Sequence, residues 1–481
     1  METINLENKK GKVTISKYLQ GQFSEHLGSG IYGGIWVGKD SSIPNIRGIR
    51  SDVVEALKNL HIPVLRWPGG FFSDIYHWRD GVGSIRYPII NTSWGNDLES
   101  NEFGTDEFFD FCQQIGAEPY LNINMSSGTI HEMTDWLEYI TSPVGKMADL
   151  RKKNGHEEPW KLKFIGIGNE EWGEDGHMRP EFYADLYRLW QTFAHQYDPT
   201  QPPLFKVACG PNIDDFNWTN VVMENANEFM DGLSLHHYGL TDLWDKKGYA
   251  TDFEPKEWDS LLYSIRKMDY FIHEHGLRMA KYDPTHRIKL IVDEWGDWLH
   301  NEPHTNPAYL YQQNTIRDAV MAATTLNIFA KHAELVGMAN IAQTVNVLQS
   351  MILTKKDQMI LTPTYYVFDM YKYHQNAKRI AAYNDNGDPL TYTVSEKDNK
   401  YIISVCNTSQ TEKNTIKFIF KDELGGILYH KRLHADKNDA HNSFNNPNNI
   451  QLMEYGDYQI TKNTITLPLK DKDIVTVILN K

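Results

Sequence analysis

Two glutamates, Glu170 and Glu294, have the residue type and the setting for proton transfer and nucleophilic attack. Each follows a short apolar run, KFIGIGN in the first case and KLIVD in the second. Two carboxyl groups that face each other in different environments can divide these roles, because one stays protonated while the other stays ionised. That division is the chemistry of glycoside hydrolysis. We therefore expect Glu170 and Glu294 to form a catalytic pair.

The two-residue period of a β-strand predicts which acidic side chain points inward. Gly166, Gly168 and Glu170 share one face of the first run, and glycine suits the crowded interior of a barrel. Glu170 should then point inward, while Glu171 points outward toward a loop contact. The second run is apolar on both faces, so the same period does not choose between its two last residues, which are both acidic.

Apolar runs alternate with amphipathic helical patterns, and this alternation predicts the elements that position the pair. This alternation fills residues 17–375 and is typical of repeated β–α units. Eight such units predict an α/β fold, a (β/α)8 TIM barrel that forms the catalytic domain. The predicted strands are Leu19–Glu25, Val64–Trp67, Pro119–Asn124, Leu162–Glu170, Leu204–Gly210, Gly232–His237, Ile288–Glu294 and Val336–Val345.

Polar residues end almost every one of these runs. Catalytic groups of a barrel gather at the carboxyl ends of its strands, where the loops to the helices begin. A single polar strand end is usually a solvated residue, but seven of them on one rim indicate an active site. The residues concerned are Glu25, His26, Arg66, Asn122, Asn124, Asn169, Glu170, His236, His237, Tyr238, Asp293, Glu294, Gln343 and Asn346.

The pattern changes near residue 376, where short alternating segments replace the helices. The segments TYTV, YIISVCN, TIKFIF, ILYHKRL, TITLPL and IVTVIL are separated by Gly, Asn and Asp. This pattern predicts a C-terminal antiparallel β-sandwich over residues 376–481, resembling a jelly roll. Residues 1–16 alternate like an edge strand, and we expect them to join the sandwich.

Composition narrows the partners and the compartment. The formal net charge of −15 argues against nucleic acid and anionic membranes, which both attract clustered Lys and Arg. Apolar runs are too short for a signal peptide or a membrane span. The three cysteines lie far apart in apolar contexts, so neither a zinc site nor a disulfide framework is indicated. These features favour a cytoplasmic enzyme without a metal or cofactor.

The motifs around these strand ends resemble those of glycoside hydrolase family 51, the α-L-arabinofuranosidases. They occur in the family's order and span nearly the whole predicted barrel, which makes the set specific although GNE or DEW alone is weak. The tail NSFNNPNNI also resembles part of the family's C-terminal sandwich. The matching stretches are FSEHLGSGIYGGIW, VLRWPGGFFSDIYHWRDGVG, FGTDEFFDFCQQIGAEPYLNIN, IGIGNEEWG, LSLHHYG, IVDEWGDW and AQTVNVLQS.

The resemblance implies a retaining double displacement on terminal, non-reducing arabinofuranosyl groups of arabino- or arabinoxylo-oligosaccharides. Glu294 would be the nucleophile, and Glu170 the general acid and then the general base. While Glu294 is anionic, its charge favours protonated Glu170, and forming the ester removes that charge. The resemblance also implies a homo-oligomer, often a hexamer. It places the substrate-binding residues Glu25, Arg66, Asn169, Tyr238, Trp298 and Gln343 around the sugar.

One residue departs from the family pattern and keeps a second substrate open. After PGG the arabinofuranosidases commonly carry a polar residue, often Asn, where this chain has Phe71. A phenyl ring in the pocket wall could change the preferred sugar or linkage, so β-xylosidase and endo-glucanase activities on the same fold are alternatives. A tryptophan at a strand end, such as Trp67, Trp94 or Trp172, is either a sugar platform or packing.

Two further alternatives belong to other functional classes. A non-catalytic carbohydrate-binding protein is one, although both carboxylates are present. The other is a metal-dependent barrel hydrolase that uses His236, His237 and Asp293, for which no further ligand at metal-site spacing is found.

Overall fold

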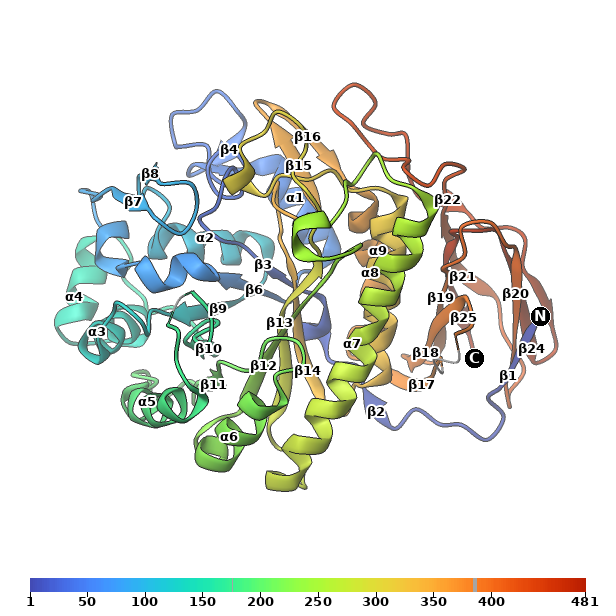
Figure 1. Cartoon of the computed structure of the whole chain (residues 1–481), viewed down its shortest axis with the longest axis horizontal. Coiled ribbons are helices and arrows are strands. Elements are labelled where there is room, and N and C mark those ends of the chain that lie inside the picture. The colour runs from blue at the N-terminus through green and yellow to red at the C-terminus, as the bar shows by residue number, and fades with distance from the viewer. Residues whose placement is uncertain (175, 384–386) are drawn as a thin grey trace.

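The computed structural model describes residues 1–174, 176–383 and 387–481. Within these residues, eight parallel strands close into the predicted barrel (Figure 1) in the order β10-β11-β12-β13-β14-β3-β6-β9. Each predicted run contributes one strand, so the barrel fold is confirmed. The strands are β3 (Gly21–Phe23), β6 (Val64–Trp67), β9 (Glu118–Ile123), β10 (Phe164–Ile167), β11 (Phe205–Ala208), β12 (Gly232–Gly239), β13 (Lys289–Asp297) and β14 (Val336–Ala342).

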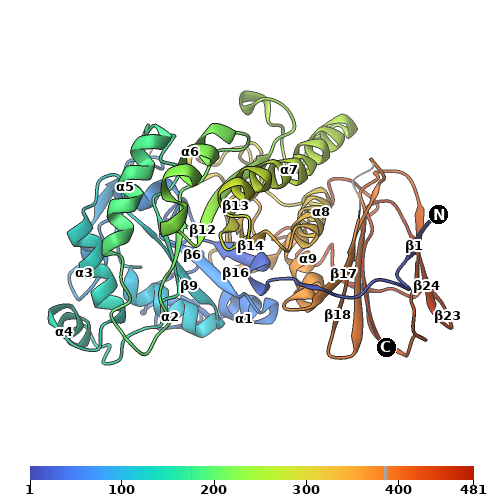
Figure 2. The ribbon, with the colours of Figure 1, turned by 90° about the horizontal axis from the view of Figure 1, so that it is seen from below.

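Helices cover the outside of the barrel (Figure 2) and bury their apolar faces against its strands. In α2, for example, Phe108, Phe111, Cys112 and Ile115 recur at helical spacing and are all buried. The helices are α1 (Ser51–Leu60), α2 (Thr105–Ile115), α3 (Ile130–Thr141), α4 (Lys146–Lys153), α5 (Pro180–Phe193), α6 (Phe216–Ala226), α7 (Pro255–Tyr282), α8 (Ile316–Lys331) and α9 (Pro363–Tyr371).

The barrel interior is tightly filled, as the glycine in β10 shows. A Cβ atom on Gly166 would lie 2.5 Å from Asn122 Oδ1, so a larger side chain does not fit there. Ile165 and Ile167 point the other way, into the buried layer between strands and helices. The predicted alternation is therefore confirmed within β10. The strand ends at Ile167, three residues before the predicted end at Glu170.

Beyond the barrel, two sheets that are antiparallel except for the pairing of β1 form the predicted sandwich. One sheet has the order β1-β20-β24-β23 and the other β2-β17-β18-β19-β25-β21-β22. The strands that come from the start of the chain are β1 (Glu2–Asn5), which pairs parallel to β20, and β2 (Val13–Thr14), which pairs with β17. The others are β17 (Lys378–Ala382), β18 (Leu390–Lys397), β19 (Lys400–Asn407), β20 (Asn414–Ile419), β21 (Ile427–Leu433), β22 (Met453–Glu454), β23 (Gln459–Thr461), β24 (Thr464–Leu469) and β25 (Ile474–Asn480).

Hydrogen bonds between helix α8 and strand β18 hold the sandwich against the barrel. The Asn327 side chain donates to Thr391 Oγ1 over 3.0 Å and accepts from Thr393 Oγ1 over 2.7 Å, both from β18. All three residues are buried, so these bonds are shielded from water. None of the described helices is long and apolar enough to cross a membrane.

Three two-stranded hairpins lie outside the barrel and the sandwich sheets. The pairs are β4 (Asn45–Ile46) with β5 (Ile49–Arg50), β7 (Ile89–Asn91) with β8 (Asp97–Glu99), and β15 (Ile352–Lys355) with β16 (Gln358–Leu361).

Candidate active site

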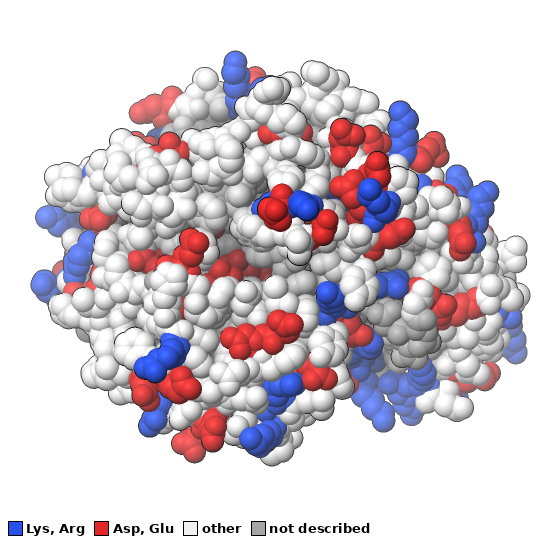
Figure 3. Space-filling view, viewed as in Figure 1, with Lys and Arg blue, Asp and Glu red and all other residues white. Residues whose placement is uncertain are grey.

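A cavity of about 480 Å³ lies at the carboxyl ends of the barrel strands. We call it the central cavity. Figure 3 shows a hollow near the middle of the viewed face, with acidic side chains gathered in it. The predicted site residues that line the cavity are Glu25, Glu170, Tyr238, Glu294, Trp298 and Gln343.

Glu170 points into the cavity because of its unusual backbone conformation, and not because of the two-residue period of a strand. Gly168 and Glu170 both have positive φ, 89° and 46°, so the chain has left the strand before the glutamate. A non-glycine residue in this region is uncommon and often marks a functional position. Glu171 points elsewhere and accepts a hydrogen bond from Ser126 Oγ over 2.8 Å. The predicted directions hold, but the predicted reason for them is wrong.

Glu294 reaches the cavity because β13 carries one extra residue at this point. Between β12 and β13 the register passes from Ser234 opposite Ile291 to His236 opposite Glu294. The pairing of β13 with β14 shifts in the same place, between Val292 and Trp295. Such a β-bulge redirects side chains next to active sites. The apolar faces of this run left the choice between Asp293 and Glu294 open, and with the bulge both side chains point inward.

The Glu294 carboxylate is held from two sides. Arg66 Nη1 donates to its Oε1 over 2.8 Å, and the Tyr238 hydroxyl donates to its Oε2 over 2.8 Å. Arg66 also donates to Asn169 Oδ1 over 2.6 Å. Arg66 and Asn169 line a narrow gap in the barrel interior, together with Asp293 and His236. The structure therefore places these two predicted residues beside the nucleophile candidate but not in the wall of the central cavity.

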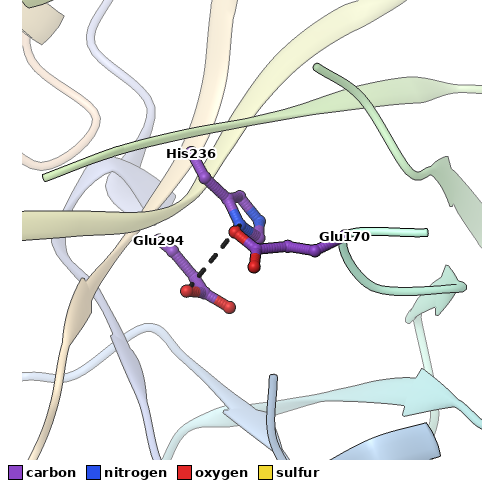
Figure 4. A group of neighbouring side chains, drawn as sticks. All are labelled: Glu170, His236 and Glu294. Carbon is purple, nitrogen blue, oxygen red and sulfur yellow. Dashed lines mark hydrogen bonds and ion pairs between the residues drawn. The ribbon is translucent and has the colours of Figure 1, made fainter. Parts of the chain in front are cut away.

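His236 connects the acidic residues (Figure 4). The sequence places it among the polar strand ends, but neither a catalytic nor a sugar-binding role was predicted for it. Its Nδ1 lies 2.7 Å from Glu170 Oε1, and its Nε2 lies 3.1 Å from Asp293 Oδ1. Burial lowers the pKa of His236, but Glu294, Asp293 and Glu170 together raise it to about 10. At neutral pH both ring nitrogens therefore donate. The histidine pair in HHY at the end of the sixth strand was the available signal.

The environment of Glu170 favours its protonated form. Burial raises its pKa most, the contact with His236 opposes this rise, and the nearby charge of Glu294 adds to it. For Asp293, burial also raises the pKa, but Arg66 and His236 outweigh it and lower the pKa below its usual value. The pKa of Glu170 is therefore raised and the pKa of Asp293 is lowered within one small volume. Opposite shifts of neighbouring carboxyl groups separate an acid from a base.

Glu25 is buried at the base of the cavity and is held by neighbouring donors. Its carboxylate accepts from the Phe72 amide and Trp94 Nε1, each over 2.9 Å, and from Gln343 Nε2 over 3.1 Å. Burial raises its pKa from 4.5 to about 7, although these three bonds lower it and the charge of Glu294 raises it further.

This pKa makes stability depend on pH. Between pH 4.5 and about 7 the folded protein holds the Glu25 proton that the unfolded chain has lost, so stability falls as pH rises. Over this window the linkage to the Glu25 proton lowers the free energy of unfolding by about 3 kcal/mol. We expect Glu25→Gln to remove this decrease. Urea unfolding of both proteins at pH 5 and pH 8 measures the difference, and equal pH dependence in the two proteins would contradict the assignment.

Aromatic side chains form much of the cavity wall. Phe71, Trp94, Trp172, Trp244 and Trp298 all line it. Of the tryptophans left open as platform or packing, Trp94 and Trp172 therefore face the cavity. Trp67 is fully buried and donates to His26 Nε2, which makes it a packing residue. Trp244 was missed because it lies in a loop beyond the strand end, where no periodicity marks it.

The proposed metal ligands do not come together as the sequence alternative required. His237 Nε2 lies 2.9 Å from the Ser264 carbonyl oxygen, in helix α7. Among the described residues, the group with metal-ligand spacing is Glu170, His236 and Glu294, with atoms within 4.8 Å of one another. The hydrogen bonds of His236 to carboxylates account for this close packing without an ion.

Two family models and a curated relative match this chain. Residues 56–253 match the family model described as Alpha-L-arabinofuranosidase 1 domain, and residues 293–472 match Alpha-L-arabinofuranosidase C-terminal domain. A Bacteroides ovatus protein named intracellular exo-alpha-L-arabinofuranosidase is 44% identical, with 99% of this chain and 95% of the relative covered.

Solved structures show the same relationship. The family 51 arabinofuranosidase of Xanthomonas axonopodis pv. citri has a TM-score of 0.94 at 40% identity, with 99% of both chains covered. The α-L-arabinofuranosidase of Thermotoga maritima, solved as an arabinose complex, has a TM-score of 0.85 at 29% identity, with 100% of this chain and 99% of that chain covered. The motifs, the barrel with its sandwich and these relatives together show the family. This chain belongs to the α-L-arabinofuranosidases of glycoside hydrolase family 51.

Proposed function

We propose that this protein is an intracellular, retaining exo-α-L-arabinofuranosidase that removes terminal arabinofuranosyl groups from arabino- or arabinoxylo-oligosaccharides. The observation that carries the mechanism is the spacing of the carboxylates, since an oxygen of Glu170 lies within 4.8 Å of an oxygen of Glu294. Retaining glycosidases hold their two carboxyl groups about 5–5.5 Å apart, whereas inverting enzymes leave room for a water molecule.

In the first step Glu294 attacks the anomeric carbon while Glu170 protonates the departing oxygen. Arg66 and Tyr238 hold the attacking carboxylate in place through their hydrogen bonds. As the ester forms, the charge on Glu294 disappears and the pKa of Glu170 falls. Glu170 can then take a proton from the water that hydrolyses the ester, and both carboxyl groups return to their starting states.

Glu25, Gln343, Tyr238 and Trp298 surround the proposed position of the sugar. Glu25 and Gln343 bond to each other and can exchange part of that contact for sugar hydroxyls. Trp298 meets Tyr238 edge to face at 5.1 Å, so it can cover one side of the ring. Asn169 accepts a hydrogen bond from Arg66 outside the cavity wall, and the family resemblance alone assigns it to the hydroxyl beside the anomeric carbon.

A substrate panel tests the proposal. The wild type should have a higher kcat/KM on 4-nitrophenyl α-L-arabinofuranoside than on the β-xyloside or on a β-glucan, and full activity in a chelator. A higher value on the xyloside would favour the β-xylosidase alternative. Sugar binding without turnover on any of these substrates would favour the non-catalytic one. The homo-oligomer implied by the family is checked by sedimentation.

Phe71 should influence which sugar is preferred. Its ring stacks on Trp94 with centroids 5.7 Å apart and planes inclined by 15°, and Trp94 donates to Glu25. Phe71→Asn restores the polar residue common in relatives and removes this stack. We expect the ratio of kcat/KM for arabinofuranoside over xyloside to change by about tenfold, the scale of a few apolar contacts in a pocket. An unchanged ratio would show that Phe71 does not set the preference.

A further inference from the structure

A pocket of about 330 Å³ opens where loops of the barrel meet a loop of the sandwich. We call it the outer pocket. Its volume lies within the range of pockets that bind small molecules. Among the described residues, none lines both this pocket and the central cavity. The residues that carry the argument are Thr305, Tyr309 and Tyr311 after β13, Thr354 and Lys355 in β15, and Phe444 between β21 and β22.

The loop after β13 separates the outer pocket from the central cavity. Leu310 lines the central cavity, whereas its two neighbours Tyr309 and Tyr311 line the outer pocket. Leu310 has a positive φ of 48°, and its carbonyl oxygen accepts from the Leu348 amide over 2.9 Å. Tyr309 packs against Gly28, where an added Cβ atom would lie 2.8 Å from Tyr309 Cβ. These contacts hold the two tyrosines on the side of the loop that faces away from the catalytic carboxylates.

The outer pocket combines aromatic rings with hydroxyl groups. Three of its residues are aromatic, and Ser29, Thr305 and Thr354 carry aliphatic hydroxyl groups. A ring can cover the C–H groups of a sugar, and hydroxyl groups can donate to and accept from sugar hydroxyls. None of the described lining residues is acidic, and Lys355, which is exposed, is the one cation among them. A single exposed ion pair contributes little to affinity, so the lining fits a neutral saccharide better than an anion.

Two hydroxyl groups of the outer pocket have hydrogen-bonding capacity left for a ligand. No described residue bonds to the Tyr311 hydroxyl, and burial together with the charge of Glu302 raises the pKa of Tyr311 to about 12. This hydroxyl therefore keeps its proton at neutral pH and can donate to a sugar oxygen. Thr354 Oγ1 donates to the Gly33 carbonyl oxygen over 3.0 Å and accepts from Asn346 Nδ2 over 2.7 Å, which leaves it a second lone pair.

We propose that the outer pocket is a second carbohydrate-binding site, which holds one unit of a neutral oligosaccharide separately from the central cavity. The three rings cover the sugar, the Tyr311 hydroxyl donates to it, and Thr354 accepts from it. This inference does not depend on the proposed arabinofuranosidase function, because the catalytic carboxylates take no part in the binding. It also gives a role to the segment NSFNNPNNI, which contributes Phe444 to the pocket.

The test places a fluorescent reporter beside the outer pocket. The three native cysteines are buried, so a cysteine introduced at an exposed position can be labelled selectively. Asn445→Cys carries an environment-sensitive fluorophore next to Phe444, and Thr411→Cys, at an exposed position elsewhere in the sandwich, is the matched control. Both labelled proteins are titrated with xylotriose. Glu294→Gln is present throughout, so that no glycosidase activity consumes the probe.

We expect a saturable change in fluorescence from the label at position 445 and none from the label at position 411. Adding Tyr311→Ala should raise the Kd for xylotriose by about tenfold or more, because the sugar loses an apolar surface as well as a donor. Tyr311→Phe, which removes only the hydroxyl, should raise it by about fivefold. Tyr263→Ala removes an exposed tyrosine of α7 outside the pocket and should leave the Kd unchanged.

Circular dichroism checks that each variant is folded, and Tyr311→Phe carries the comparison if Tyr311→Ala is not. The proposal is overturned if xylotriose produces no saturable change at position 445, or the same change at both labels. It is also overturned if the folded Tyr311 variants bind xylotriose as tightly as Tyr263→Ala does.

Discussion

Glu294→Ala should lower kcat on 4-nitrophenyl α-L-arabinofuranoside by about 10⁴-fold or more, because the covalent step loses its attacking oxygen. The effect should be as large with good leaving groups as with poor ones, since the nucleophile is needed for both. The substitution also leaves the buried Arg66 without one of its carboxylate partners, so some loss of stability is expected.

Glu294→Gln is the matched control for that loss of stability, because it keeps the size of the side chain and removes only the charge. Circular dichroism should show both variants folded. Azide enters the space left in the alanine variant and should restore turnover, with a glycosyl azide of inverted configuration as product. Undiminished turnover in Glu294→Ala would exclude Glu294 as the nucleophile.

Glu170→Ala should show the second largest effect, and this effect should depend on the leaving group. On an unactivated arabino-oligosaccharide we expect kcat/KM to fall by about 10³-fold, because the departing alkoxide needs a proton. On the 4-nitrophenyl substrate the first step needs little acid, so kcat/KM should be largely spared. Hydrolysis of the ester loses its base, and stopped-flow absorbance should record a burst of nitrophenolate.

The neighbouring glutamate supplies the control for this experiment. Glu171→Gln alters a carboxylate that faces Ser126 and lies outside the cavity wall, so its activity should remain close to that of the wild type. Azide should rescue Glu170→Ala with retained configuration, opposite to the product from Glu294→Ala. Equal losses on both substrates would contradict the acid–base role of Glu170.

The barrel could be predicted from the sequence because parallel strands buried on both faces read as short apolar runs, and polar residues mark where they end. The central cavity gathers residues from five of those ends: Glu25, Glu170, Tyr238, Glu294 and Gln343. Local patterns of this kind are preserved in the fold, because each strand end is defined by residues next to it in the chain.

What the sequence did not reveal depends on backbone geometry or on distant contacts. The positive φ at Glu170 and the bulge in β13 break the two-residue period at the two residues where the prediction needed it most. His236 acquires its raised pKa only from residues that are 57 or more positions away. Such a group reads in the sequence as a histidine in a strand, and only the folded barrel surrounds it with carboxylates.

The parallel pairing of β1 with β20 has a consequence for how the protein is made. Glu2 lies opposite Ile416, so the first strand emerges from the ribosome long before its partner. At about 5–20 residues per second, translation of the intervening chain takes roughly 20–80 s. During that interval β1 is an unpaired edge that could join a foreign strand. Its length of only four residues limits this hazard until β20 arrives.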